Sequence, residues 1–208
     1  MTRLEVSASK PDPRAVAKVV GILERGGVVA FPTDTLYGLA VDPRSEQAVE
    51  KLFDAKGRGE RMPIPLIAAD RAQALAMGEF GEVERRLAQE FWPGPLTIIV
   101  PARPGIAPRL LAGGSTVGIR VPSHEVARAL CARMGRCLTA TSANLTGRRA
   151  PASADEIDPA LVARIDAVLD SGPVPGGAPS TIVRVKSGRP ELVRAGAIAY
   201  DRVIRSLQ

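Results

Sequence analysis

The sequence predicts an α/β protein with a twisted, mixed β-sheet and helices packed against it. Short apolar runs rich in β-branched residues alternate along the chain with amphipathic segments of helical period. They interleave without the regular strand–helix–strand rhythm of a dinucleotide-binding fold, which favours a mixed sheet over a purely parallel one. Because 208 residues can bury a sizeable core, we predict a single domain over residues 1–208.

Capping residues mark the expected helix starts. Asp12 stands before Pro13, a common pairing of a capping side chain with proline in the first turn, and Gly26 ends that helix. Ser153 and Glu156 have the spacing of a capping box, in which each side chain bonds the other residue's backbone. The remaining helices are expected to begin at Ser45, Asp70, Glu82, Ser123 and Asp201.

Apolar runs between these helices predict the strands. Pro65 lies inside the run 64–68 and lacks a backbone donor, so we expect this strand at a sheet edge. The segment 170–180, rich in Gly and Pro, is expected to be a mobile flap or binding loop. The other predicted strands are 28–31, 96–100, 116–121, 137–140, 167–169, 181–185 and 192–194.

Composition and charge limit the possible functions. The net charge of +6 is compatible with nucleic acid, with an anionic small ligand, or with no special partner. Cys131 and Cys137 have neither disulfide-framework nor metal-site spacing, and His124, the single histidine, is expected on a solvated helix face. We therefore expect no protein-held metal and no histidine-based nucleophile. The absence of a signal pattern and of a membrane-spanning apolar run favours a cytoplasmic protein without membrane contact.

Several short motifs contain groups suited to anion binding, although each also has a purely structural interpretation. Lys56-Gly57-Arg58 ends a predicted helix and could contact phosphates or complement the helix dipole. Ser142-Ala143-Asn144 follows a strand and could bind a ligand or satisfy its own turn. Thr33 lies in a turn-forming segment, and strand alternation places Thr116 and Arg120 on one face. The standard glycine-rich nucleotide signatures are absent.

The ordered set of motifs resembles the YrdC/TsaC family of threonylcarbamoyl-AMP synthases. Each motif alone is weak, but together they occur in the family's order and span most of the chain. The resemblance implies a YrdC-like fold with a basic concave ligand cleft, in the short form that ends near Gln208. The matching segments are 26–39, 56–58 with 63–64, 92–97, 117–122, 142–144, 180–182 and 192–196.

This resemblance implies an enzyme, an L-threonylcarbamoyladenylate synthase that forms threonylcarbamoyl-AMP and pyrophosphate. Its substrates would be L-threonine, bicarbonate or CO2, and ATP with Mg2+ held largely by the phosphates. The product would serve t6A modification of tRNA, with downstream threonylcarbamoyl-transfer proteins and tRNA itself as partners. The implied ATP contacts are Lys56, Arg58, Thr116, Ser142, Asn144 and Arg194, with Lys56 and Arg58 catalytic; the implied threonine contacts are Thr33, Arg120 and Ser180.

One departure from the family concerns threonine binding. Many members have a histidine shortly after the segment that matches Pro63-Ile64, where this chain has Ile67 and its neighbours. The corresponding threonine contact is therefore expected to be lost or supplied from elsewhere.

The implied nucleophile is a carbamate of threonine, which is already anionic. The reaction therefore needs positioning and charge neutralisation more than a general base. Two alternatives stay open at this point. One is a module of the same fold that binds double-stranded RNA or tRNA without synthase activity. The aromatic content of 3% counts against stacking on single strands. The other is a paralogue that shares the fold and catalyses a different reaction.

Overall fold

The computed structural model describes residues 1–57, 59 and 62–208. Its strands are β1 (Thr2–Glu5), β2 (Val29–Phe31), β3 (Gly38–Ala40), β4 (Leu66–Ile67), β5 (Leu96–Pro101), β6 (Thr116–Arg120), β7 (Leu138–Thr139), β8 (Thr141–Ser142), β9 (Ala167–Asp170), β10 (Thr181–Lys186) and β11 (Arg189–Arg194). Its helices are α1 (Pro13–Glu24), α2 (Glu46–Lys56), α3 (Arg71–Leu75), α4 (Glu82–Phe91), α5 (Glu125–Met134), α6 (Pro159–Val162) and α7 (Tyr200–Arg205), with short 3-10 helices at Pro108–Leu111 and Ala154–Glu156.

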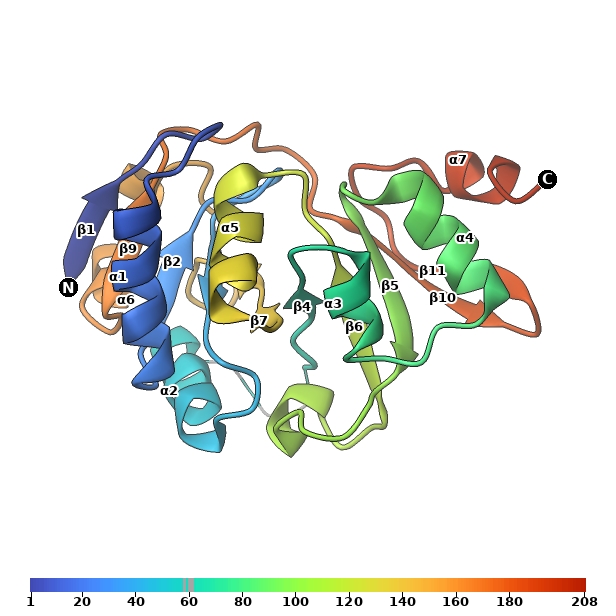
Figure 1. Cartoon of the computed structure of the whole chain (residues 1–208), viewed down its shortest axis with the longest axis horizontal. Helices are drawn as coiled ribbons and strands as arrows, with labels where there is room; N and C mark the ends of the chain where they lie inside the picture. Colours follow the sequence, from blue (N-terminus) through green and yellow to red (C-terminus); the bar gives the residue numbers. More distant parts are fainter. Residues whose placement is uncertain (58, 60–61) are drawn as a thin grey trace.

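The strands form two sheets and not one (Figure 1). The first sheet has the order β1-β9-β2-β3-β8, and the second has the order β11-β10-β5-β6-β4-β7. Both contain parallel and antiparallel pairs. The predicted class, a mixed α/β fold with flanking helices, is therefore confirmed, while the division into two sheets is a finding of the structure. Within the described residues, no helix is both long and apolar enough to cross a membrane.

One apolar core lies between the first sheet and helices α1 and α5, which lie side by side in Figure 1. The Asp12 side chain accepts a hydrogen bond from Arg14 N at 2.9 Å and begins α1 as predicted. The buried stripe of α1 has the spacing of one helical face, so it packs as a unit onto the sheet. The stripe consists of Val16, Val19, Val20 and Leu23, and meets Val29 and Phe31 of β2.

A second and larger core contains residues of both sheets. Because successive side chains of a strand point to opposite faces, Val28 and Ala30 face this core while Val29 and Phe31 face the other. Leu52 of α2 and Ile98 of β5 belong to the same cluster of buried side chains. The apolar interior is therefore continuous from the first sheet to the second. The assignment of a single domain over residues 1–208 stays a prediction.

The segment 138–142 joins the two sheets. Its first half, β7, pairs with β4 in the second sheet, and its second half, β8, pairs with β3 in the first. Thr139 lies at the crossing, where its hydroxyl oxygen accepts from Val41 N at 2.9 Å and its own N–H donates to Val41 O at 3.2 Å. The Ser142-Ala143-Asn144 motif is therefore placed at the junction between the sheets.

Two capping predictions and one edge prediction are wrong. The strand after Pro65 is internal, because β4 lies between β6 and β7. The proline precedes the paired residues, so its missing N–H costs nothing, and its carbonyl accepts from Ala140 N at 2.9 Å. Ser123 bonds Asp34 instead of capping α5, and Ser153 makes no side-chain cap bond. Strands β1 and β3 are further elements that sequence reasoning missed.

Candidate functional site

A cavity of about 970 Å³ is lined by residues from both sheets. Its polar lining consists mainly of hydroxyl and guanidinium groups, and its described lining contains no Asp, Glu or His. The hydroxyl side chains are Thr33, Thr35, Tyr37, Thr97, Thr141, Ser142 and Ser180, and the guanidinium side chains are Arg120, Arg149 and Arg194. Five residues singled out from the sequence meet here: Thr33, Arg120, Ser142, Ser180 and Arg194.

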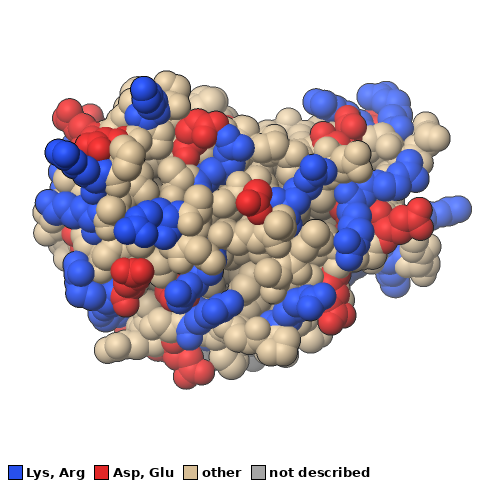
Figure 2. Space-filling model, viewed as in Figure 1, with Lys and Arg blue, Asp and Glu red and all other residues tan. Residues whose placement is uncertain are grey.

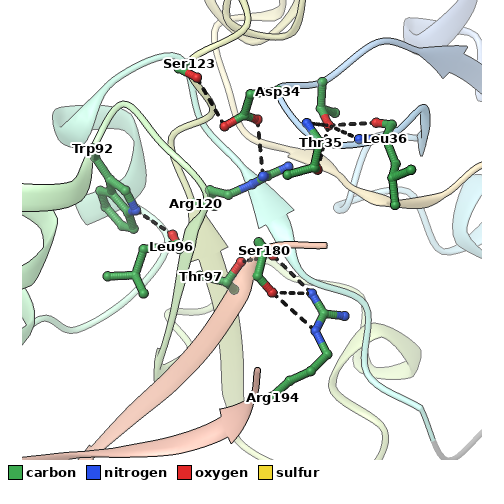
Figure 3. A network of polar contacts seen from close by, with 11 residues as sticks. Asp34, Thr35, Leu36, Trp92, Leu96, Thr97, Arg120, Ser123, Ser180 and Arg194 are labelled. Carbon is green, nitrogen blue, oxygen red and sulfur yellow. Dashed lines mark hydrogen bonds and ion pairs between the residues drawn. The ribbon is translucent and has the colours of Figure 1, made fainter. Parts of the chain in front are cut away.

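Arg120 ends β6 with its side chain buried beside Asp34 (Figure 3). The residue is 7% exposed, and its Nη1 lies 3.2 Å from Asp34 Oδ1. The two groups form an ion pair without the alignment of a hydrogen bond, since neither of these atoms has a hydrogen-bond partner. Burial lowers the pKa of Arg120, and the charge of Asp34 opposes that shift. The guanidinium is therefore held by charge, with donor capacity left for a ligand.

Two neighbours of Asp34 complete its surroundings. The Ser123 hydroxyl donates to Asp34 Oδ2 at 3.2 Å. His124 forms the N-cap of α5, and its buried Nδ1 has no hydrogen-bond partner among the described residues. Burial lowers the pKa of the His124 ring, against the attraction of Asp34 and Glu125. His124 is thus partly exposed, and the predicted solvated position holds only in part, because the turn at Asp34 packs near this helix start and Nδ1 is buried.

Arg194 reaches the cavity from the end of β11. Its Nη2 donates to Ser180 O at 2.7 Å and to Ser180 Oγ at 3.1 Å, and its Nε donates to Ser180 O at 3.3 Å (Figure 3). Ser180 Oγ also lies 2.9 Å from Thr97 Oγ1. Burial, and after it repulsion from Arg120, lowers the pKa of Arg194. Two guanidinium groups therefore act on each other electrostatically at this end of the cavity.

Gly196 allows this close packing. A Cβ at this position would lie 2.5 Å from both Ser180 C and Thr181 N, which is closer than real Cβ atoms approach backbone. Only glycine lets the chain after β11 pass so near the Ser180 backbone.

Thr33 holds the turn between β2 and β3. Its Oγ1 donates to Leu36 O at 2.7 Å and accepts from Thr35 N at 3.2 Å and Leu36 N at 3.3 Å. The residue is only 3% exposed, yet it lines the cavity. The turn interpretation of this segment is confirmed by these hydrogen bonds. Contact between Thr33 and a ligand stays a prediction.

Lys56 is directed at the Ser142-Ala143-Asn144 turn. It is 2% exposed, and its Nζ donates to Ser142 O at 2.5 Å, Asn144 O at 2.8 Å and Asn144 Oδ1 at 3.3 Å. Ser142 Oγ donates to Asn144 Oδ1 at 2.5 Å. Gly57, in the left-handed region with φ 58°, ends α2 directly after the lysine. The ammonium group therefore holds together the turn that brings Ser142 to the cavity.

Four predicted site residues are not among the described lining of the main cavity, and Lys56, which is buried against the Ser142 turn, is one of them. Asn144 lies behind Ser142 and lines a smaller neighbouring cavity. Thr116 is exposed at the opposite end of β6 from Arg120 and is outside the described lining of the main cavity. Arg58 lies outside the described residues. The catalytic and binding roles assigned to all nine predicted site residues, including Lys56, Arg58, Thr116 and Asn144, stay predictions.

Sequence reasoning also missed residues of this site. Thr97 ends the matching segment 92–97 but had no assigned role, and it bonds Ser180. Arg149 lines the cavity although it lies outside every matching segment. Ile67 lines the cavity in the region where family members have a histidine, so the wall is apolar there. Residues of segment 170–180 line the cavity, and Gly176 N donates to Thr35 O at 2.9 Å. Its role as a mobile flap or binding loop stays a prediction.

Tyr37 bonds the start of this loop through its hydroxyl, whose ionisation is expected to lower the stability of the protein at alkaline pH. Its buried hydroxyl lies 2.7 Å from Gly172 O and 3.1 Å from Asp170 Oδ1, and burial raises its pKa to about 12. Since the folded pKa exceeds the unfolded value of about 10, this contribution is present below pH 10 and lost as pH rises towards 12. We expect a loss of about 2 kcal/mol in unfolding free energy.

Denaturant unfolding at several pH values between 9 and 12 measures this loss. Tyr37→Phe should remove the Tyr37 contribution and make the pH dependence less steep, while the buried thiols of Cys131 and Cys137, whose pKa values burial also raises, keep theirs. Tyr200→Phe, which deletes the bond from its hydroxyl to Pro190 O, is the matched control and should keep the dependence of the unmodified protein. Parallel curves for the unmodified protein and Tyr37→Phe would contradict the prediction.

Comparison with known proteins identifies the family. The sequence model of the Sua5/yciO/yrdC family, described as telomere recombination, matches residues 21–196. Threonylcarbamoyl-AMP synthase of Bacillus subtilis is 38% identical over 197 residues, which cover 94% of this chain and 57% of the relative. The synthase of Idiomarina loihiensis is 38% identical over 160 residues, which cover 76% of this chain and 86% of that relative. The chain thus spans little more than half the length of its Bacillus relative.

Solved structures agree with this similarity. Pyrococcus abyssi Sua5, crystallised in complex with L-threonine, matches with a TM-score of 0.94 and 30% identity over 100% of this chain and 61% of that one. Escherichia coli YciO matches with a TM-score of 0.88 and 26% identity over 98% of this chain and 100% of that one. The resemblance inferred from the ordered motifs is confirmed: the chain belongs to the Sua5/yciO/yrdC family.

Proposed function

We propose that this chain is an L-threonylcarbamoyladenylate synthase, which forms threonylcarbamoyl-AMP and pyrophosphate from L-threonine, bicarbonate or CO2, and ATP. The observation that carries the proposal is a cavity whose described lining has three guanidinium groups and no carboxylate. Such a cavity suits ligands with several negative charges. The names of the synthases from Bacillus and Idiomarina, and the L-threonine complex of Pyrococcus Sua5, support the choice of substrates.

Threonine would bind at the Arg120 end. The Arg120 guanidinium can donate to the threonine carboxylate, since its contact with Asp34 is not an aligned hydrogen bond. Thr33 and Ser180 supply hydroxyls from opposite sides of the cavity, one on the first sheet's turn and one before β10. A small ligand with a carboxylate and a hydroxyl matches these groups.

ATP would bind between Ser142 and Arg194. Arg194 bonds only neutral oxygens of Ser180 and no carboxylate in the described structure, so its charge is available to a phosphate. Lys56 and Asn144 hold the turn that presents Ser142, so we assign them to positioning this side of the site. Contacts from Arg58 and Thr116 belong to the same proposal.

The proposed chemistry matches the residues that are present. A carbamate oxygen of N-carboxythreonine attacks the α-phosphorus of ATP, a new P–O bond forms, and the bond to the bridging oxygen breaks to release pyrophosphate. The carbamate is already an anion, so no side chain has to remove a proton. The arginines would neutralise charge that builds up on the phosphates.

Magnesium would reach this site with ATP. No group of three or more His, Cys, Asp or Glu side chains in the described structure could hold a metal ion. The hydroxyls and guanidinium groups of the cavity do not form a Mg2+ site of their own, because Mg2+ prefers carboxylate, phosphate and water oxygens. The phosphates of ATP would therefore be its ligands.

We further propose that the product passes to downstream threonylcarbamoyl-transfer proteins for t6A modification of tRNA in the cytoplasm. Two free, buried cysteines are compatible with a reducing compartment. Lys and Arg side chains on the face shown in Figure 2 are interspersed with Asp and Glu, so this face offers no continuous basic track for RNA.

Incubation with ATP, Mg2+, L-threonine and bicarbonate tests the proposal, with threonylcarbamoyl-AMP detected by mass spectrometry. We expect the adenylate and an equal amount of pyrophosphate, and neither when threonine or bicarbonate is omitted. Salt-dependent tRNA binding without any nucleotide product would instead support the RNA-binding module. A different adenylate would support a paralogous reaction.

A further inference from the structure

Arg148 and Arg149 are neighbours in sequence but differ in what they line. Arg149 lines the main cavity, whereas Arg148 lines only a smaller cavity of about 260 Å³ that also contains Asp155, Glu156 and Asp158. Arg149 lines that smaller cavity as well, so it stands at the wall between the two. Adjacent residues of one loop thus differ in their access to the proposed substrates.

The backbone around Arg149 is held on both sides. Asn144 Nδ2 donates to Arg148 O at 2.5 Å, and Arg148 N donates to Leu145 O at 3.0 Å. On the other side, Tyr37 N donates to Pro151 O at 2.9 Å. Asn144 is the residue that Lys56 also binds. The network of Lys56 and Asn144 therefore extends to the backbone next to Arg149.

The Arg149 side chain has no polar partner among the described residues. It is exposed and makes no hydrogen bond or ion pair with the described residues, although three carboxylates line the neighbouring cavity. Arg120, by comparison, is paired with Asp34, and Arg194 bonds Ser180. A guanidinium on a fixed backbone with no acidic partner is suited to bind phosphate oxygens in a bidentate manner.

We propose that Arg149 is a further ATP-binding residue that contacts the phosphates from the side of the first sheet. Arg194 would contact them from the second sheet, and Ser142 lies on the same segment as Arg149. The two arginines would bracket a chain of phosphates across the cavity. This inference rests on the proposed function and adds a residue that the family motifs do not single out.

Arg149→Ala and Arg148→Ala form the matched pair that tests it. We expect Arg149→Ala to raise KM for ATP, and to weaken binding of ATP and inorganic tripolyphosphate in calorimetry, by roughly tenfold. KM for threonine should change less than about twofold. Arg148→Ala should resemble the unmodified protein in all of these measurements. Arg149→Lys should recover only part of the binding, because lysine retains the charge and loses the fork.

Equal ATP and tripolyphosphate binding in the two alanine variants would overturn the proposal. So would equal increases in KM for ATP and threonine, which would indicate a structural effect. Weaker tRNA binding with unchanged ATP binding would assign Arg149 to RNA and also overturn it. If the unmodified protein makes no threonylcarbamoyl-AMP, the proposed function fails, while the two binding measurements still decide whether Arg149 binds phosphate.

Discussion

Lys56→Ala is expected to lower the free energy of unfolding by about 3–5 kcal/mol and to abolish adenylate formation. The substitution would remove the buried, positively charged Lys56 ammonium group, which donates to Ser142 O, Asn144 O and Asn144 Oδ1. Asn144 Oδ1 would keep the bond from Ser142 Oγ. Buried acceptors that lose their partner cost about 1–3 kcal/mol each, and some of that cost is relieved by relaxation. Activity would fall because Ser142 would no longer be held at the cavity.

Denaturant unfolding followed by circular dichroism measures the stability loss, and pyrophosphate release measures activity. Lys51→Ala is the control, since Lys51 is an exposed residue of the same helix with one bond to Gly26 O at 3.2 Å. It should cost less than about 1 kcal/mol. If Lys56→Ala is as stable as Lys51→Ala and still inactive, Lys56 is the phosphate-facing charge that the sequence motif suggested, and the positioning role is wrong.

Arg120→Ala is expected to reduce threonine-dependent pyrophosphate release at least roughly 100-fold, because a charge-assisted contact to the threonine carboxylate is lost. It should also lower the unfolding free energy by about 3–5 kcal/mol, since Asp34 would be left as a buried, unpaired carboxylate. The double variant Asp34→Ala/Arg120→Ala removes that unpaired charge. Its stability should therefore exceed that of Arg120→Ala while its activity stays low.

Thermal unfolding and initial rates at several threonine concentrations separate these effects. Arg184→Ala serves as the control, because Arg184 forms an exposed ion pair with Glu191 at 2.8 Å, which should contribute little to stability. An Arg120→Ala variant with an unchanged KM for threonine would contradict the assigned role. Recovery of activity in the double variant would contradict it as well.

Local patterns predicted much of the fold. Helix α1 was identified from Asp12, Pro13 and an apolar stripe of helical spacing, all of which act within a few residues. Most strands were identified from short β-rich runs. The predictions failed where partners are distant: β1 pairs with β9, and its short sequence does not show that partner. Ser123 has a capping sequence but bonds Asp34, a residue far away in the chain.

The sequence by itself determined the fold class, the family and five of the residues that meet in the cavity. Only the tertiary structure decided that Lys56 points at the Ser142 turn and that Arg149, not Arg148, reaches the main cavity. The physical reason is that long charged side chains have many rotamers. The direction of such a side chain depends on which acceptor oxygens and open spaces distant segments place around it. Here residues 138–142, which cross from one sheet to the other, place the Ser142 turn next to Lys56.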